Sequence, residues 1–385
     1  MRFDFDGIWN KIHLYEITNK VSRKAPVNST APIRMISYGN GFILQSDKYS
    51  RDNAGESLKK YTLLKKGEMA YNHGASKNKK YGVCYSLKES DEARIPFVYH
   101  AFQINRGLPA FWNYALNISQ IDKQLKKLVS SGARMDGLLN ISYDDYMSIS
   151  VYEPCVDEQA KISAFLSVID KRIAVQNKII SKYETLIKGI YHDFFSKPAD
   201  YAIKIKDLII KGKAGGTPSS TVAQYYNGDI PFLSISDMTK QGKYVSYTEK
   251  HISKSGIENS SAWIVPSNSL IFSMYASVGL VCINTVPLAT SQAMFSMVLK
   301  DHRMIEYIYY YLNFFRETKI HRHIETGTQS NINAETVRNI DIPFQSNHLK
   351  LVETLNSIEK RLNNEKDMLS LLLDLKAYLL SKLFI

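Results

Sequence analysis

The 385-residue sequence has few of the residues that build disulfide frameworks, zinc clusters or membrane spans. Its three cysteines, Cys84, Cys155 and Cys282, are odd in number, lie far apart and form no CxxC pair. This argues against a disulfide framework and a structural zinc site. No apolar run approaches the roughly 18–20 residues of a membrane helix, and the N-terminus has acidic residues where a signal peptide has its apolar core. We therefore expect a cytoplasmic protein with no membrane partner.

Motifs of enzymes that act on nucleotides or DNA are also missing. The segment GKAGGTPSS at Gly212 has no lysine followed by Ser or Thr, so it is not a phosphate-binding loop. The sequence contains no HExxH, no GxSxG and no methyl-donor loop with an Asn-Pro-Pro-aromatic motif. His321 and His323 are two residues apart and would lie on different sides of a helix. We predict no catalytic residue, no metal site and no cofactor bound by this chain.

Positive charge is what the sequence has in excess. Lysine and arginine number 49 against 37 acidic residues, a net charge of +12, while 44% of the residues are apolar. The apolar fraction is sufficient for folded cores. The basic balance favours a polyanionic partner such as nucleic acid.

A long repeated segment divides the chain into halves. IDKRIAVQNKIISKYETLIKGIYHDFF, from Ile169, aligns without gaps with IEKRLNNEKDMLSLLLDLKAYLLSKLF, from Ile358, and the same offset of 189 residues places Pro154 on Pro343. Both segments are predicted to be long amphipathic helices, and in the first the core positions are alternately four and three residues apart, the pattern of a coiled coil. The second helix also has Leu349 on its expected apolar face. We predict that the two helices pack through Ile162, Leu166, Ile169, Ile173, Gln176, Ile180, Tyr183, Ile187, Leu355, Ile358, Leu362, Leu369 and Leu372.

The stretches before the helices differ from them in composition. Short β-branched and aromatic runs alternate there with Gly, Pro, Asn and Ser turns, which predicts mixed α/β (α+β) domains. Their landmarks come in the same order, with Leu14–Ile17 matching Ile205–Ile209 and Gly82–Cys84 matching Gly279–Cys282. We predict an internal pseudo-two-fold repeat with a first globular domain at 1–153, a spacer helix at 154–197, a second globular domain at 198–343 and a second spacer helix at 344–385.

Basic and amide side chains stand beside aromatic residues in turn-rich segments of both halves. Lys and Arg can neutralise phosphates, while Asn, Gln, Ser and Arg can bond to base edges. For any one residue, the alternative is an ordinary solvated loop. The candidate DNA-binding residues are Arg23, Lys24, Arg51, Asn72, His73, Ser76, Lys77, Lys79, Lys80 and Arg134 in the first half, and Lys211, Lys213, Thr217, Ser219, Ser273, Tyr275, Ser277, Gln292, Arg322, Thr328 and Gln329 in the second.

The second half contains a characteristic series of motifs. GGTPS at Gly215–Ser219 is followed by YYNGDIPFLSISDM at Tyr225–Met238, by VPSNSLIFSMYASVG from Val265, by SQA at Ser291–Ala293 and by TGTQSNIN…IDIPF from Thr326. With the duplicated helix, this order resembles the specificity subunits of type I restriction–modification enzymes. The first half follows the plan more loosely, with RMDGLLNIS at Arg134–Ser142 as its closing segment and no GGTPS.

The resemblance implies a fold, a function and a set of partners. Two target-recognition domains would each bind one half of a split double-stranded DNA target, joined by an antiparallel coiled coil. Adenine methylation would belong to modification subunits, two of them, and ATP-driven cleavage to restriction subunits. S-adenosylmethionine, ATP and Mg²⁺ would bind to those partners.

Two other functions compete with a non-catalytic specificity subunit. A self-contained DNA methyltransferase or nuclease would need a cofactor loop or a carboxylate cluster, and the sequence shows neither. A coiled-coil adaptor would not need two basic α/β domains. We therefore predict a DNA-binding subunit that directs partner enzymes.

Overall fold

The computed structural model describes residues 5, 7–48, 60–74, 76, 79–129, 138–323 and 331–384. The chain forms two compact units. Unit 1 comprises residues 1–177 and 367–385, and unit 2 comprises residues 178–366. Each unit therefore contains one globular part and a portion of each of two long helices, α4 (Val156–Phe195) and α10 (His348–Leu383). None of the described helices has the length and apolar run needed to cross a membrane.

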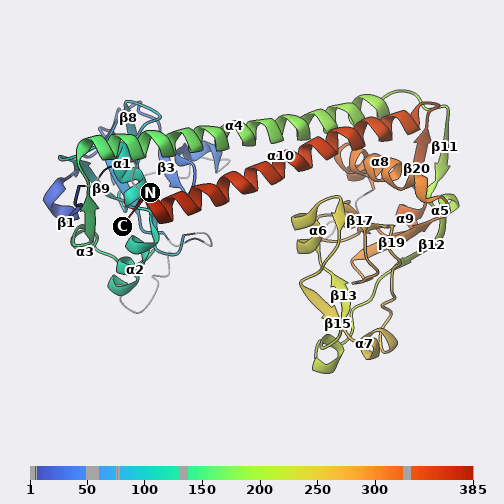
Figure 1. Cartoon of the computed structure of the whole chain (residues 1–385). Coiled ribbons are helices and arrows are strands. Elements are labelled where there is room, and N and C mark those ends of the chain that lie inside the picture. The colour runs from blue at the N-terminus through green and yellow to red at the C-terminus, as the bar shows by residue number, and fades with distance from the viewer. Residues whose placement is uncertain are drawn as a thin grey trace. The chain divides into compact units, whose positions relative to one another are not determined.

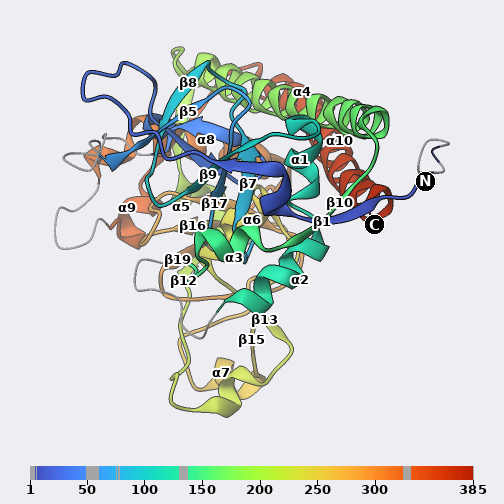
Figure 2. The ribbon, with the colours of Figure 1, turned by 90° about the vertical axis from the view of Figure 1, so that its left-hand side faces the viewer.

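The two long helices lie side by side (Figures 1 and 2). In unit 1, the fully buried Ile162 and Leu166 of α4 share a core with Leu379 and Leu383 of α10. In unit 2, residues near the end of α4 share a core with residues near the start of α10, so the helices run antiparallel. This confirms the expected packing.

The predicted seam is buried along its whole length. All thirteen seam side chains are buried or partly buried, including the polar Gln176, which is 1% exposed. Leu349 was expected on the same face, but this prediction is wrong, because its side chain is 54% exposed. Leu351, 6% exposed, and Leu355, fully buried, begin the apolar face of α10 instead.

Unit 1 is built around an antiparallel sheet with the order β2-β9-β6-β7. Successive side chains of its strand β6 point to opposite faces of the sheet and enter two different cores. Met69 and Tyr71 face the core shared with α4 and α10, while Ala70 faces a core formed with the outer strands β3, β4, β5 and β8. The elements of unit 1 before α4 are β1 (Asn10–His13), η1 (Leu14–Ile17), β2 (Thr18–Lys20), β3 (Arg34–Ser37), β4 (Gly41–Leu44), η2 (Gln45–Asp47), β5 (Thr62–Lys65), β6 (Met69–Asn72), β7 (Val83–Ser86), β8 (Glu92–Ile95), β9 (His100–Ile104), α1 (Pro109–Ala115), α2 (Ser119–Leu128), α3 (Tyr143–Met147) and β10 (Ser150–Glu153).

Unit 2 repeats this arrangement with the sheet order β12-β19-β16-β17-β14. Leu270 and Phe272 of β16 face the core shared with the long helices, and Ile271 faces a second core containing Met238 and Val245. The three-stranded sheet β15-β13-β18 adds to this plan, and β13, β15 and α7 lie on the side away from the long helices (Figures 1 and 2). The elements of unit 2 between α4 and α10 are β11 (Tyr201–Lys204), α5 (Ile205–Leu208), β12 (Ile209–Ala214), η4 (Ala223–Tyr226), β13 (Ile230–Leu233), α6 (Ile235–Gln241), β14 (Tyr244–Val245), β15 (Lys250–Ile252), α7 (Lys254–Glu258), β16 (Ser269–Ser273), β17 (Val281–Asn284), β18 (Ala289–Thr290), β19 (Met294–Leu299), η5 (His302–Met304), α8 (Ile305–Thr318), η6 (Ile320–Arg322), α9 (Ala334–Arg338) and β20 (Asp341–Phe344).

The strand pair that leads into each long helix shows the repeat most directly. Asn10 of β1 lies opposite Glu153 of β10, and Tyr201 of β11 lies opposite Phe344 of β20, an offset of 191 residues for both positions. The first core residues of the helices, Ile162 and Leu351, keep the expected offset of 189. Two residues are therefore lost between strand and helix in the second half. The expected match of Pro154 with Pro343 is wrong, because Pro343 lies in β20 where unit 1 has Tyr152.

Candidate nucleic-acid interface

Equivalent hairpins carry candidate residues in both units. The hairpins β6–β7 and β16–β17 occupy the same place in their sheets, and Cys84 and Cys282 are each the second residue of the returning strand, which confirms their expected correspondence. A backbone hydrogen bond ties each turn to a later segment, from Leu139 N to His73 O (2.9 Å) and from Ile332 N to Met274 O (3.0 Å). The loops at residues 73–82 and 274–280 are thus counterparts.

Two candidates in the unit 1 loop are not available to DNA. His73 is 5% exposed, and its ring nitrogens lie 2.7 Å from the carbonyl oxygen of Leu139 and 2.9 Å from that of Val98. The buried Lys79 donates to the carboxylate of Asp122 (2.5 Å) and to the Asn117 carbonyl (3.0 Å). The sequence marked both as surface residues, but packing turns them inward to anchor the loop.

The other candidate residues of unit 1 differ in their exposure and in the hydrogen bonds that they make within the fold. The Arg23 guanidinium makes a two-pronged bond to Glu68, at 2.9 and 3.2 Å, and a third bond to the Leu63 carbonyl (3.0 Å), so it serves the fold. The Asn72 amide oxygen accepts from Gly74 N (3.0 Å). Lys24, Ser76 and Lys80 are exposed. Five candidates lie outside the described residues, namely Arg51, Lys77, Arg134, Thr328 and Gln329.

In unit 2, three loops that are distant in sequence form one surface. We call residues 215–219, 275–278 and 291–293 the three-loop surface. Backbone bonds join these loops, from Gly215 N to Met294 O (3.1 Å), Gly216 N to Thr290 O (2.9 Å) and Met274 N to Ala293 O (2.8 Å). A Cβ on Gly215 would lie 2.0 Å from the Thr290 oxygen, so only glycine permits this approach.

The side chains of the three-loop surface combine polar and aromatic groups. The Thr217 hydroxyl donates to the Gln292 amide oxygen at 2.5 Å, and both residues are exposed. Tyr275 is 40% exposed and the neighbouring Ser277 is exposed at a φ of 57°. Ser219 is also exposed, with its hydroxyl 2.8 Å from that of Thr221. These groups can approach a base or a phosphate.

Ser273 does not reach this surface. It is fully buried, and its hydroxyl donates to the carbonyls of Tyr275 (2.5 Å) and Ala276 (3.0 Å). It therefore supports the turn in which Ala276 and Ser277 adopt positive φ values. The prediction that Ser273 contacts DNA is wrong.

Lysines border the three-loop surface. Lys211 and Lys213 are exposed on β12, the edge strand that runs directly into Gly215. The Lys211 ammonium lies 4.2 Å from the centre of the Trp263 ring, a cation–π contact that leaves the charge at the surface. Both lysines therefore stay predicted phosphate-contacting residues.

Helix α2 of unit 1 carries a group of exposed lysines that the candidate DNA-binding residues do not include. Lys123, Lys126 and Lys127 are exposed on α2, while Ile121 and Leu125 of the same helix are buried. The amphipathic pattern of SQIDKQLKKL carries this signal in the sequence. In unit 2, the end of α8 is followed by two exposed basic residues, His321 and the candidate DNA-binding residue Arg322. Each unit thus places basic side chains shortly before the segment that bonds to its hairpin.

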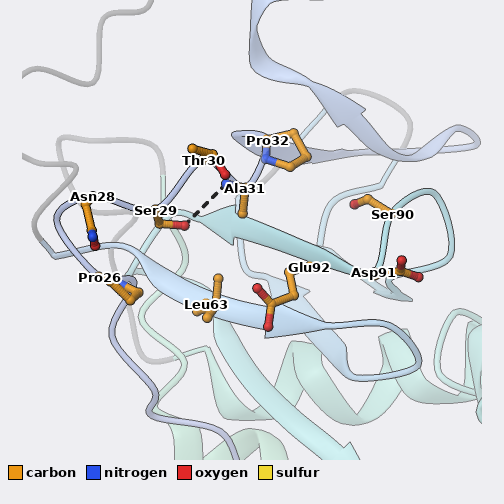
Figure 3. Close-up of a pocket in the computed structure, with 10 residues that line it drawn as sticks. All are labelled: Pro26, Asn28, Ser29, Thr30, Ala31, Pro32, Leu63, Ser90, Asp91 and Glu92. Atoms are coloured by element: carbon orange, nitrogen blue, oxygen red, sulfur yellow. Dashed lines mark hydrogen bonds between the residues drawn. The ribbon is translucent and has the colours of Figure 1, made fainter.

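A shallow hollow in unit 1 has the opposite character (Figure 3). It measures about 490 Å³ and lies between the segment around Pro26–Pro32 and strands β5 and β8. Asp91 and Glu92 line it, and their carboxylates disfavour a phosphate there. In the described part of the chain, no group of three or more His, Cys, Asp or Glu side chains is placed to hold a metal ion.

Comparison with known proteins agrees with this arrangement. Residues 200–368 match the family model described as the type I restriction modification DNA specificity domain. The HindI specificity subunit of Haemophilus influenzae is 22% identical over 94% of this chain and 97% of its own length. Over nearly its whole length the chain is thus similar to a type I restriction enzyme specificity subunit. The MjaIX specificity subunit of Methanocaldococcus jannaschii is 28% identical over 190 residues, which are 48% of this chain and 43% of that protein.

Solved structures share the fold of this chain. A type I restriction–modification S subunit from M. genitalium superimposes with a TM-score of 0.58 at 14% identity, covering 99% of this chain and 98% of that one. A chain from a study of complex assembly in a type I R-M system gives 0.56 at 15% identity, covering 98% and 97%.

Proposed function

We propose that this chain supplies DNA sequence specificity to a type I restriction–modification complex, with each unit binding one half of a bipartite duplex target. The observation that supports this proposal is the shared frame, meaning the strand pair and the four-strand sheet that occur in both units. Both units repeat the strand pair that leads into a long helix, and both repeat the four-strand sheet. The segments inserted between β2 and β6 and between β12 and β16 differ in both length and fold. A shared frame with divergent insertions suits two binding surfaces with different targets.

The exposed side chains supply both parts of DNA recognition. Lysines on α2 and β12 are suited to phosphates, which give affinity without reading sequence. The amide and hydroxyl groups of the three-loop surface have the donors and acceptors that distinguish base pairs in the major groove.

Catalysis is assigned to partner subunits in this proposal. Two modification subunits bind S-adenosylmethionine and methylate adenine, and restriction subunits use ATP and Mg²⁺ to cleave. The absence of the corresponding motifs from this sequence supports that division of labour.

An apolar stripe on α10 supports docking of a protein partner. Met368, Leu371, Leu375 and Tyr378 recur three or four residues apart, and each is between 43% and 63% exposed. Large apolar side chains in such a row mark a contact surface, because a solvated helix face is normally polar.

The test is purification of the full chain with the host proteins that accompany it, followed by mapping of methylated bases across DNA. We expect a bipartite target with a non-specific spacer, and no methyl transfer, nuclease or ATPase activity from the rigorously purified chain alone. A continuous target, or methyl transfer by the isolated chain, would contradict the proposal.

A further inference from the structure

The three-loop surface contains one amide whose hydrogen bonding is half satisfied. Gln292 is exposed, and its Oε1 accepts the Thr217 hydroxyl at 2.5 Å. No acceptor for its Nε2 is found among the described residues. An amide oxygen has two lone pairs and an amide nitrogen has two donors. Gln292 therefore keeps one acceptor site and two donors for a ligand.

The position of this amide is set by the backbone. Gly215 and Gly216 pack so closely that a Cβ on either would lie within 2.3 Å of a neighbouring atom, and their amides bond to the segment around residue 292. Thr217, one residue later, is thereby held at the amide it orients. A side chain fixed in this way loses little conformational entropy when it binds.

We propose that Gln292, oriented by Thr217, reads an adenine in the half-site bound by unit 2; this inference rests on the proposed function. In the major groove adenine presents the N7 acceptor beside the N6 donor. The free Nε2 donor of Gln292 complements N7, and the remaining lone pair on Oε1 complements the N6 amino group. Gln292 is the base-reading residue and Thr217 is a positioning residue.

Lys213 lies on the strand that pairs with the segment following the Gln292 loop. It is exposed on β12, two residues before Gly215, and Ala214 pairs with Phe295 in the strand that follows the Gln292 loop. A phosphate contact from Lys213 would therefore be adjacent to a base contact from Gln292. The two contacts differ in kind, because the lysine strengthens binding to every sequence and the amide only to one.

The test is selection of bound duplexes from a pool with random bases, using the full chain with its copurifying subunits. Gln292→Ala should relax one adenine position of the second half-site, with discrimination falling by roughly ten- to a hundredfold. Gln292→Glu keeps the size and the Thr217 bond but has acceptors only, so the same position should change from A to C. Thr217→Val should relax the position partially, and the exposed amide variant Asn364→Ala on α10 should change nothing.

The outcomes separate this inference from the proposed function. Unchanged sequence preference in both Gln292 variants, or equal weakening for all sequences, would overturn the assignment of Gln292. A wild-type complex that selects no bipartite sequence would instead overturn the proposed function.

Discussion

Units 1 and 2 share the face of the sheet that packs on the long helices and differ on the opposite face. The strands β2-β9-β6-β7 and β12-β19-β16-β17 have the same order, and each central hairpin contributes to the core that its own unit forms with parts of α4 and α10. The other face is covered by the strand pairs β3–β4 and β5–β8 in unit 1 and by a three-stranded sheet with helices in unit 2. Packing on the long helices constrains the residues of the first face, while the second face packs on elements that differ between the units.

Each unit also anchors a loop with a lysine whose side chain is 9% exposed, but the two lysines bond to different parts of their units. Lys79 bonds to Asp122 of α2. Lys243, just before β14, bonds to Glu359 of α10 (2.6 Å) and to the Tyr310 hydroxyl (2.9 Å), with Glu306 at 3.3 Å. Burial acts to raise the pKa of Glu306, but hydrogen bonds from Tyr244 and Asn356 and the Lys243 charge outweigh it and hold that pKa below 4.5. The insertion of unit 2 is thus tied directly to its long helix.

The largest expected effect is a change of DNA sequence specificity on exchange of the globular part of unit 2. Replacing residues 199–342 with the corresponding domain of another specificity subunit should give a new second half-site and leave the first unchanged, because the insertions pack within their own unit. Methylation mapping of the chimeric complex measures both half-sites. A change in both would show that the units do not read independently.

Lys243→Met should destabilise unit 2 strongly. Removing the amine leaves Glu306 and Glu359, each less than 20% exposed, without their cation, which costs about 3 kcal/mol. Urea unfolding measures the loss, and Lys254→Met, at an exposed ion pair, is the matched control and should leave the midpoint unchanged.

The stability difference between wild type and Lys243→Met should depend on pH, because it involves the ionised carboxylate of Glu306. Because its folded pKa lies below the ordinary value, it contributes stability above pH 4.5 and loses it as the pH falls through the folded pKa. The gap between wild type and Lys243→Met should therefore narrow in acid. An unchanged gap would place the effect of Lys243 in packing alone.

Lys79→Ala and Lys80→Ala should differ in their effect on stability, although both lysines lie in one loop. Lys79→Ala leaves Asp122 unpaired and should cost about 2 kcal/mol of stability, since that carboxylate is partly solvated. Lys80→Ala should leave stability unchanged, because its side chain is exposed. Equal unfolding midpoints for the two variants would contradict this distinction.

The smallest effect is expected from the α2 lysines. The double variant Lys126→Ala, Lys127→Ala should reduce the slope of log affinity against log salt by roughly 1.8, about 0.9 for each lost phosphate contact. Stability should be retained, because alanine favours a helix and both side chains are exposed. Lys171→Ala on α4 is the control, and an unchanged slope in the double variant would remove α2 from the interface.

The sequence alone determined the long helices, their pairing seam and the duplication. A heptad pattern is local information, repeated over enough turns that only one packing arrangement buries it. The mixed α/β character of the units and the equivalence of Cys84 and Cys282 were also readable, because short strands and turn residues are set nearby in the chain. The ordered motifs were sufficient to indicate the family.

The tertiary structure decided which polar residues face outward. His73, Lys79 and Ser273 have the composition of a binding loop, yet each bonds to groups contributed by the surrounding fold. Thr217 and Gln292 are 75 positions apart and meet only because glycines let their loops touch. Burial and long-range pairing depend on how strands are ordered in the sheet, and no local pattern in a sequence encodes that order.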